Sequence, residues 1–250
     1  PMLTSLAEYR NKKRPAVFRS VLPWLHADEN LGAHRDDLPW GQILAGAKQR
    51  ARQLGFQLEP TWIGESEHSP ESFARMLKAR GVAGVICGPS TMSTDWLREF
   101  TKTDLPIVCV GTYNFGDVKL VHVSADHYQN ARILAQDFER RGFKKVLVLL
   151  RPHLEVILMR QYGSLFQRLA TETDRSTKWL VHQHEKEDLP EVGKLILQEK
   201  PHAIILQGWD QYQQLRENLN QKALAYFQKH PVGLLCHSDR VQHPADLIGV

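Results

Sequence analysis

An arginine and a glycine, Arg160 and Gly163, stand in an R-x-x-G spacing shortly after the apolar run 146–150. An unbroken apolar run of this length is typical of a parallel strand that is covered on both faces. A guanidinium group can hold two ligand oxygens at once through its fork of N–H donors. Because α/β proteins bind polar ligands at the mouth of a parallel sheet, the spacing indicates a ligand-binding cation. A surface salt bridge is the alternative role for Arg160.

Two short clusters hold residue types that also occur in metal and catalytic sites. Residues 182–185, HQHE, could supply metal ligands, but they follow a strand-like run and have no partner cluster nearby in the sequence. A solvated loop is the simpler interpretation. Residues 236–239, CHSD, cannot form a catalytic triad among themselves, because consecutive residues of a strand point to opposite faces. They are expected to end a strand and to face a cleft.

The motifs of the common α/β enzymes are absent from the sequence. It has no G-x-G-x-x-G after the first expected strand, no G-x-x-x-x-G-K-[ST], no G-x-S-x-G and no H-E-x-x-H. These absences count against dinucleotide oxidoreductases, P-loop nucleotidases, serine hydrolases and zinc proteases. We therefore expect a protein that is not an enzyme and that uses no cofactor.

The composition is that of a globular protein with 42% hydrophobic and 24% charged residues. No apolar run approaches the roughly 20 residues of a membrane span, and the N-terminus does not resemble a signal peptide, so a cytoplasmic location without membrane contact is expected. The net charge of +4 tolerates a polyanionic partner without requiring one. Cys87, Cys109 and Cys236 lie far apart in the sequence and are expected to be reduced core thiols.

Helix, glycine and apolar strand follow one another at 54–56, 80–82 and 141–143, which predicts stacked β-α units with mainly parallel sheets. Two Rossmann-like lobes, 15–142 and 143–240, fit this order better than one sheet. The expected strands are 16–25, 56–63, 84–87, 105–110, 118–123, 146–150, 179–182, 203–206 and 233–236. The expected helices are 41–54, 70–80, 95–100, 126–141, 159–171, 189–198 and 211–229, the last weakened by Asn218 and Asn220.

The joint order of these segments resembles the effector-binding domain of the lactose/galactose repressor (LacI/GalR) family over about residues 1–210. The segments 80–86 and 105–110 carry the resemblance most specifically. The matching positions are Gly46, Ala51, 54–56, Leu77, 80–86, 105–108, Val123, Asp126, 142–143, Val146, Arg160 and Gly163.

The resemblance implies a periplasmic-binding-protein-like fold of type I, with two lobes that hold a small ligand in a cleft between them. It also implies a cytoplasmic homodimer in which an effector, expected to be a carbohydrate, allosterically controls binding to operator DNA. The family's helix-turn-helix precedes the part that matches this chain. Residues 1–14 fall on its hinge segment, with Leu6 as the residue that wedges into the DNA minor groove. From the residues alone, a frayed linker is the alternative.

Family positions for effector contacts fall on several residues of this chain. Arg160 matches the effector-binding arginine, and Trp209 and Asp210 lie where the family places a polar pair on the ligand. An indole such as Trp209 could stack on a sugar ring, although packing is the alternative. Asp239 resembles an acidic residue after the next strand. The other lobe is expected to contribute Trp24, His26 and Trp40.

The family pattern continues beyond the position that matches Val250. Residues 241–250 are expected to begin a return segment toward the first lobe, and the natural protein is expected to be longer. The leading hypothesis is therefore a sugar-responsive transcriptional regulator domain. A sugar-binding protein of a transporter with the same fold is the second hypothesis, and an α/β enzyme is the least favoured.

Overall fold

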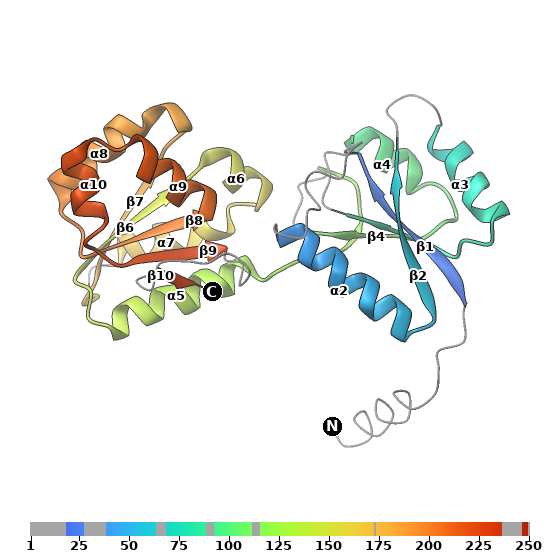
Figure 1. Cartoon of the computed structure of the whole chain (residues 1–250), viewed down its shortest axis with the longest axis horizontal. Coiled ribbons are helices and arrows are strands. Elements are labelled where there is room, and N and C mark those ends of the chain that lie inside the picture. The colour runs from blue at the N-terminus through green and yellow to red at the C-terminus, as the bar shows by residue number, and fades with distance from the viewer. Residues whose placement is uncertain are drawn as a thin grey trace, which may run out of the picture. The chain divides into compact units, whose positions relative to one another are not determined.

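The computed structural model describes residues 19–27, 39–63, 69–88, 93–111, 116–172, 174–236 and 247–249, which fold into two compact units (Figure 1). The units divide between Ser124 and Ala125. Each is an α/β unit built on a five-stranded sheet whose paired strands are all parallel. The predicted pair of parallel α/β lobes is thereby confirmed. Within the described residues, no helix is both long and apolar enough to cross a bilayer.

The first unit has the strand order β2-β1-β3-β4-β5. Its strands are β1 (Ser20–His26), β2 (Phe56–Trp62), β3 (Val85–Cys87), β4 (Ile107–Val110) and β5 (Val121–Val123). Its helices are α2 (Pro39–Gln53), α3 (Pro70–Ala79) and α4 (Thr94–Phe100). Helix α2 packs in a cluster with Trp24 and Leu58, whereas α3 and α4 pack in another with Leu25 and Val85. Neighbouring strand residues thus point to opposite faces, and both faces are covered.

The second unit has the strand order β10-β9-β8-β6-β7. Its strands are β6 (Lys145–Leu150), β7 (Lys178–Gln183), β8 (Ala203–Gly208), β9 (Val232–Cys236) and β10 (Leu247–Gly249). Its helices are α5 (His127–Arg140), α6 (Pro152–Ile157), α7 (Gln161–Thr171), α8 (Leu189–Glu199), α9 (Trp209–Asn218) and α10 (Gln221–Phe227), with a short 3-10 turn, η2 (Lys186–Asp188).

Strand β6 is covered on both faces, which explains why its sequence is apolar without interruption. Val146, Val148 and Leu150 pack into one core cluster with α5 and α7, whereas Leu147 and Leu149 pack into a second cluster with α8, α9 and α10. All five side chains are fully buried. A strand covered on both faces has no solvent side that would require polar residues.

The boundary between the units differs from the one expected near Gly142, because α5 belongs to the second unit. Leu134 and Phe138 of α5 lie in the core cluster of that unit. They press so closely on β9 that a Cβ atom added to Gly233 would lie 2.8 Å from the ζ carbon of Phe138. The periodicity of a helix shows which of its faces is buried but not which sheet buries it. Gly142, the glycine that was expected to follow this helix, has a positive φ of 80°.

Three other segments differ from expectation. The single helix expected over 211–229 is two helices, and Asn220 begins the second by accepting a hydrogen bond of 3.0 Å from the N–H of Ala223. Helix α6 was not expected and begins with Pro152, whose fixed φ suits the first helical position. Strand β10 pairs in parallel with β9, so this part of the expected return segment joins the sheet of the second unit.

Candidate ligand-binding site

The sheet of the second unit has a topological switch point between β6 and β8. Strand β6 is the first of this unit in the chain, β7 lies on one side of it and β8 on the other, so successive connections leave in opposite directions. Open α/β sheets bind ligands beyond the carboxyl ends of the strands at such a point. Arg151 directly follows β6, and Gln207 and Gly208 end β8. Figure 1 shows these two strands side by side beneath α6 and α9.

Arg151 and Asp210 form a two-pronged ion pair at this switch point. The Nη1 atom of Arg151 donates to Oδ2 of Asp210, and Nη2 donates to Oδ1 at 3.1 Å. The Arg151 side chain is only 10% exposed, whereas that of Asp210 is 62% exposed. Burial by itself would raise the pKa of the Asp210 carboxyl, but the adjacent guanidinium and hydrogen bonds from the backbone N–H groups of Gln211 and Asp210 together lower the pKa below its ordinary value. Asp210 therefore stays ionised and faces solvent.

Glu155, on α6, is a buried carboxylate beside this pair. Its Oε2 atom accepts a hydrogen bond of 2.7 Å from the N–H of Gly163, and its Oε1 atom accepts one of 2.8 Å from Nε2 of Gln207. Burial raises its pKa, and both hydrogen bonds and the positive charge of Arg160 oppose this shift. A Cβ atom added at Gly163 would lie 2.6 Å from Oε2. Gly163, the glycine of the R-x-x-G spacing, therefore binds this carboxylate through its N–H and leaves room for it by having no side chain.

Gln207 and Gln211 extend these contacts across the sheet. The Oε1 atom of Gln207 accepts from the N–H of Arg151 at 2.6 Å, and its own N–H donates to Oε1 of Gln211 at 2.7 Å. The Nε2 atom of Gln211 donates to the carbonyl of Leu149 at 3.3 Å and to Nε2 of His184 at 2.8 Å. We call Arg151, Glu155, His184, Gln207, Asp210 and Gln211 the switch-point network. It joins β6, β7, β8, α6 and α9.

His184 departs from the solvated loop expected for residues 182–185, because it is only 1% exposed. Its Nδ1 atom lies 3.0 Å from the carbonyl of Glu185, so Nδ1 carries the proton and Nε2 accepts from Gln211. Burial lowers the pKa of its imidazole, which therefore stays neutral. The solvated-loop prediction failed for this residue because the partner of its ring nitrogen comes from α9. In the described part of the chain, no three His, Cys, Asp or Glu side chains gather as metal ligands.

Arg160 is the N-cap residue of α7, with an exposed side chain. It has a left-handed φ of 55°, and Met159 before it has one of 52°. Such angles are unusual for residues other than glycine and often mark functional sites. The charge of Arg160 acts on buried Glu155, so the guanidinium lies near the switch-point network. The structure thus places Arg160 near the carboxyl edge of the sheet of this unit, and its contact with an effector stays a prediction.

The other predicted site residues lie in different surroundings. The ring of Trp209 is half-buried and stacks on Tyr212, with ring centres 5.0 Å apart, so packing accounts for part of its role. Trp24 is fully buried, and His26, at the carboxyl end of β1, is 2% exposed. A Cβ atom added at Gly88 would lie 2.2 Å from Nε1 of Trp24, so Trp24 is a core residue of the first unit. Asp239, the side chain of Trp40 and Leu6, which was expected to contact DNA, lie outside the described residues.

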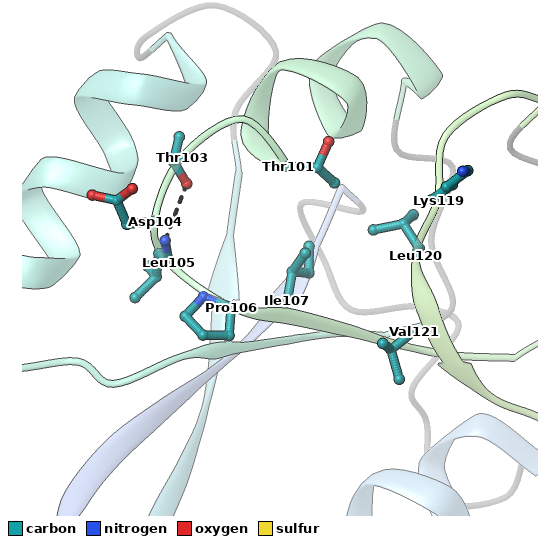
Figure 2. Close-up of a pocket in the computed structure, with 9 residues that line it drawn as sticks. All are labelled: Thr101, Thr103, Asp104, Leu105, Pro106, Ile107, Lys119, Leu120 and Val121. Carbon is teal, nitrogen blue, oxygen red and sulfur yellow. Dashed lines mark hydrogen bonds between the residues drawn. The ribbon is translucent and has the colours of Figure 1, made fainter.

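One pocket of about 310 Å³ lies in the first unit (Figure 2). It lies at the amino ends of β4 and β5, beside Ile107 and Val121, which begin these strands. This edge of the sheet is opposite to the carboxyl ends, where α/β sheets bind their ligands. We therefore do not assign this pocket to the effector. Its lining residues are Thr101, Thr103, Asp104, Leu105, Pro106, Ile107, Lys119, Leu120 and Val121.

Sequence reasoning missed most of the switch-point network. Arg151 directly follows the apolar run 146–150, and a charged residue at the end of a buried strand is a signal that could have identified it. Glu155, Gln207 and Gln211 carry no such local signal, because they lie within elements and find their partners only through the sheet order. Cys87 and Cys109 lie in the predicted core position, 2% and 1% exposed.

The family of the chain follows from a match to the model described as periplasmic binding proteins and sugar binding domain of LacI family. The match covers residues 33–165, more than half of the 250 residues. The two units with parallel sheets have the type I periplasmic-binding-protein-like architecture, and the chain belongs to this family. The family consists of regulatory and binding proteins rather than enzymes. A search of curated proteins found no match.

Solved structures with the same fold include several transcriptional regulators. The Lac repressor dimer bound to operator and the anti-inducer ONPF is 15% identical, with a TM-score of 0.55, and the match covers 92% of this chain and 77% of that chain. The Escherichia coli transcriptional repressor ascG is 15% identical, with a TM-score of 0.55 and coverages of 86% and 78%. A periplasmic binding protein/LacI transcriptional regulator from Alkaliphilus metalliredigens QYMF, complexed with D-xylulofuranose, is 15% identical, with a TM-score of 0.52 and coverages of 86% and 76%.

Proposed function

We propose that this chain is the effector-binding and dimerisation domain of a LacI-type transcriptional regulator. It binds a sugar or a sugar derivative, and the bound effector allosterically controls binding to operator DNA by the full-length homodimer in the cytoplasm. The observation that carries the proposal is the switch-point network beside Arg160, in a chain of this family. A helix-turn-helix outside these residues reads the operator, and Leu6 in the hinge contacts the minor groove.

The chemistry of this edge suits a polyhydroxy ligand. Arg160 offers a fork of donors to ligand oxygens, and the exposed Asp210 carboxylate offers acceptors to hydroxyl groups. Trp209 adds an aromatic ring next to Asp210. Asp239 is a further proposed contact, and His26 and Trp40 are the contacts proposed for the first unit. Ligand sites of this kind combine a few placed polar groups with an apolar lining.

Allosteric control requires that the effector bind one arrangement of the two units more tightly than another. A difference of ~1.4 kcal/mol in effector binding between two arrangements changes their ratio tenfold. The effector thereby changes the affinity of the whole dimer for DNA, and operator DNA changes the affinity for the effector by the same factor.

A sugar-binding protein of a transporter is the second candidate, because the matched family model also describes periplasmic binding proteins. The two candidates differ in their partners. Operator binding by the full-length protein that responds to a sugar supports the regulator. Sugar binding without any effect on DNA, by a monomer in sedimentation analysis, supports the transporter protein.

A thermal-shift screen against free sugars and sugar phosphates tests the proposal. A ligand at roughly 100 times its Kd adds about 2.7 kcal/mol to the free energy of unfolding, which is readily detected. Arg160→Ala abolishes this shift, and because the side chain is exposed, the unliganded protein changes by only about 0.5 kcal/mol or less. Met159→Ala, at the exposed preceding residue, is the matched control and keeps the shift. A panel without any hit, or a hit unaffected by Arg160→Ala, contradicts the assigned site.

A further inference from the structure

The ion pair between Arg151 and Asp210 is asymmetric in its burial. The Arg151 side chain is 10% exposed and lies beneath a carboxylate that is 62% exposed. Both terminal nitrogens of Arg151 are directed at the two oxygens of Asp210. A bidentate pair of this kind fixes the plane of the carboxylate as well as its position.

The ion pair between Arg151 and Asp210 is not expected to add much to the stability of the folded state. Within the part of the chain that the structure describes, Nε of Arg151 is the one buried side-chain nitrogen or oxygen without a hydrogen-bond partner. A buried charged group with an unsatisfied donor weakens the folded state, and buried ion pairs are often replaced by apolar residues without loss of stability. The arrangement is explained if Asp210, the exposed member of the pair, binds a ligand.

Backbone contacts fix the position of Arg151. Its N–H donates to Oε1 of Gln207 at 2.6 Å, and it begins the connection from β6 to α6. Gln207 is itself held by Glu155 and Gln211. These contacts therefore hold the start of the Arg151 side chain in place at the switch point. The charge of its guanidinium helps to keep the Asp210 carboxylate ionised.

We infer that Arg151 is a positioning residue that holds Asp210 as an acceptor of ligand hydroxyl groups, and that this site takes an uncharged polyol and rejects its phosphate ester. The inference rests on the proposed function. The charge of Arg151 is already matched by Asp210, so it offers little attraction to an anion. The exposed carboxylate repels a phosphate placed beside it, and this repulsion opposes the attraction that the exposed guanidinium of Arg160 offers to an anion. Hydroxyl groups instead donate to the carboxylate oxygens.

Asp210→Asn gives the sharpest test, because it removes the repelling charge and leaves Arg151 unmatched. The first probe is inorganic phosphate at constant ionic strength, measured by isothermal titration. We expect little binding to the wild-type chain and a Kd roughly tenfold lower or better for Asp210→Asn. The double variant Asp210→Asn with Arg151→Met returns to wild-type behaviour. Equal phosphate binding by the wild type and Asp210→Asn, or a gain that survives in the double variant, overturns the inference.

The second arm uses pairs of a free sugar and its phosphate, D-ribose with D-ribose 5-phosphate and D-glucose with D-glucose 6-phosphate. The wild type binds the free sugar more tightly than the corresponding sugar phosphate, and Asp210→Asn reduces this difference in affinity. Arg151→Lys, which keeps the charge but not the two-pronged geometry, retains part of the affinity for the free sugar, whereas Arg151→Met, which leaves the Asp210 carboxylate without its positioning partner, loses most of that affinity. Wild-type preference for a phosphate overturns the inference but leaves the proposed function standing. Absence of binding to either member of both pairs counts against the proposed function, and the phosphate titration still decides the inference.

Discussion

The backbone N–H of Gly163 donates a hydrogen bond of 2.7 Å to Oε2 of Glu155. A Cβ atom at position 163 would approach the same oxygen to 2.6 Å, so the glycine leaves room for the carboxylate. Gly163→Ala is expected to lower the free energy of unfolding by about 1–3 kcal/mol, because the helix start or the buried carboxylate must move. Chemical denaturation measures this loss. Gln167→Ala, at an exposed position of the same helix, is the control, and equal stability of Gly163→Ala and the wild type contradicts the close approach.

Glu155 is expected to make stability depend on pH in an unusual direction. Burial raises its pKa above the ordinary 4.5, so the folded protein binds this proton more tightly than the unfolded chain does. The contribution of Glu155 to stability is present below pH 4.5 and is lost as the pH rises through the raised pKa. The free energy of unfolding of Glu155→Gln, which cannot ionise, is therefore expected to increase relative to that of the wild type as the pH rises from 4.5. Denaturation curves at several pH values measure the difference. The exposed Glu187→Gln should show no such trend, and a constant difference for Glu155→Gln contradicts the prediction.

His184 is expected to make stability depend on pH in the direction opposite to that of Glu155. Burial lowers its pKa below 6.5, so the unfolded chain binds this proton more readily than the folded protein. Its contribution to stability is present above pH 6.5 and is lost as the pH falls through the lowered pKa. His184→Gln is expected to lose less stability than the wild type between about pH 7 and pH 5. His153→Gln, at a side chain that is 55% exposed, should keep the wild-type slope. Titration of the His184 ring near pH 6.5 in nuclear magnetic resonance spectra would exclude this account.

Met159 and Arg160 both have left-handed backbone angles, with φ values of 52° and 55°. This conformation costs about 1–2 kcal/mol for each residue that is not glycine, and a glycine also loses more entropy on folding, so the two effects partly cancel. Met159→Gly and Arg160→Gly are each expected to leave stability unchanged or to raise it by up to about 1 kcal/mol. Only Arg160→Gly should lose effector binding. Thermal denaturation with and without a ligand from the screen separates the two effects. A clear loss of stability in both variants would refute the backbone angles.

Asn220 separates α9 from α10 by capping the second helix. Asn220→Ala is expected to lower the free energy of unfolding by about 1 kcal/mol, because the N–H of Ala223 loses its acceptor. Asn218→Ala, two residues earlier at an exposed position, should have a smaller effect. Urea denaturation of both variants measures the difference. A larger loss for Asn218→Ala would contradict the assigned cap.

Local signals in the sequence predicted most elements of the fold. The apolar run 146–150 predicted a strand covered on both faces, and β6 has that position. A helix was expected to begin at Asp126, and the Asp126 carboxylate caps α5 by accepting from the N–H of Gln129 at 2.9 Å. Such predictions succeed because a strand period, a cap or a positive φ involves residues that are close together in the chain.

The candidate site was predictable only in part. Arg160 and Asp210 were identified from the resemblance to a family, and the structure places both at the carboxyl edge of the second sheet. Their buried supports were not identified, because polar residues such as Gln207 look like ordinary strand residues in the sequence. Burial of His184 was missed for the same reason, since its partner on α9 is 27 residues away.

The sequence by itself determined the two α/β units and the R-x-x-G spacing, because these depend on neighbours along the chain. Only the tertiary structure decided that β8 lies beside β6, which brings Gln207 to Arg151 across 56 residues. It also decided that α5 covers the second sheet. The physical reason is that strand order and helix docking depend on contacts between distant segments, which no local period encodes.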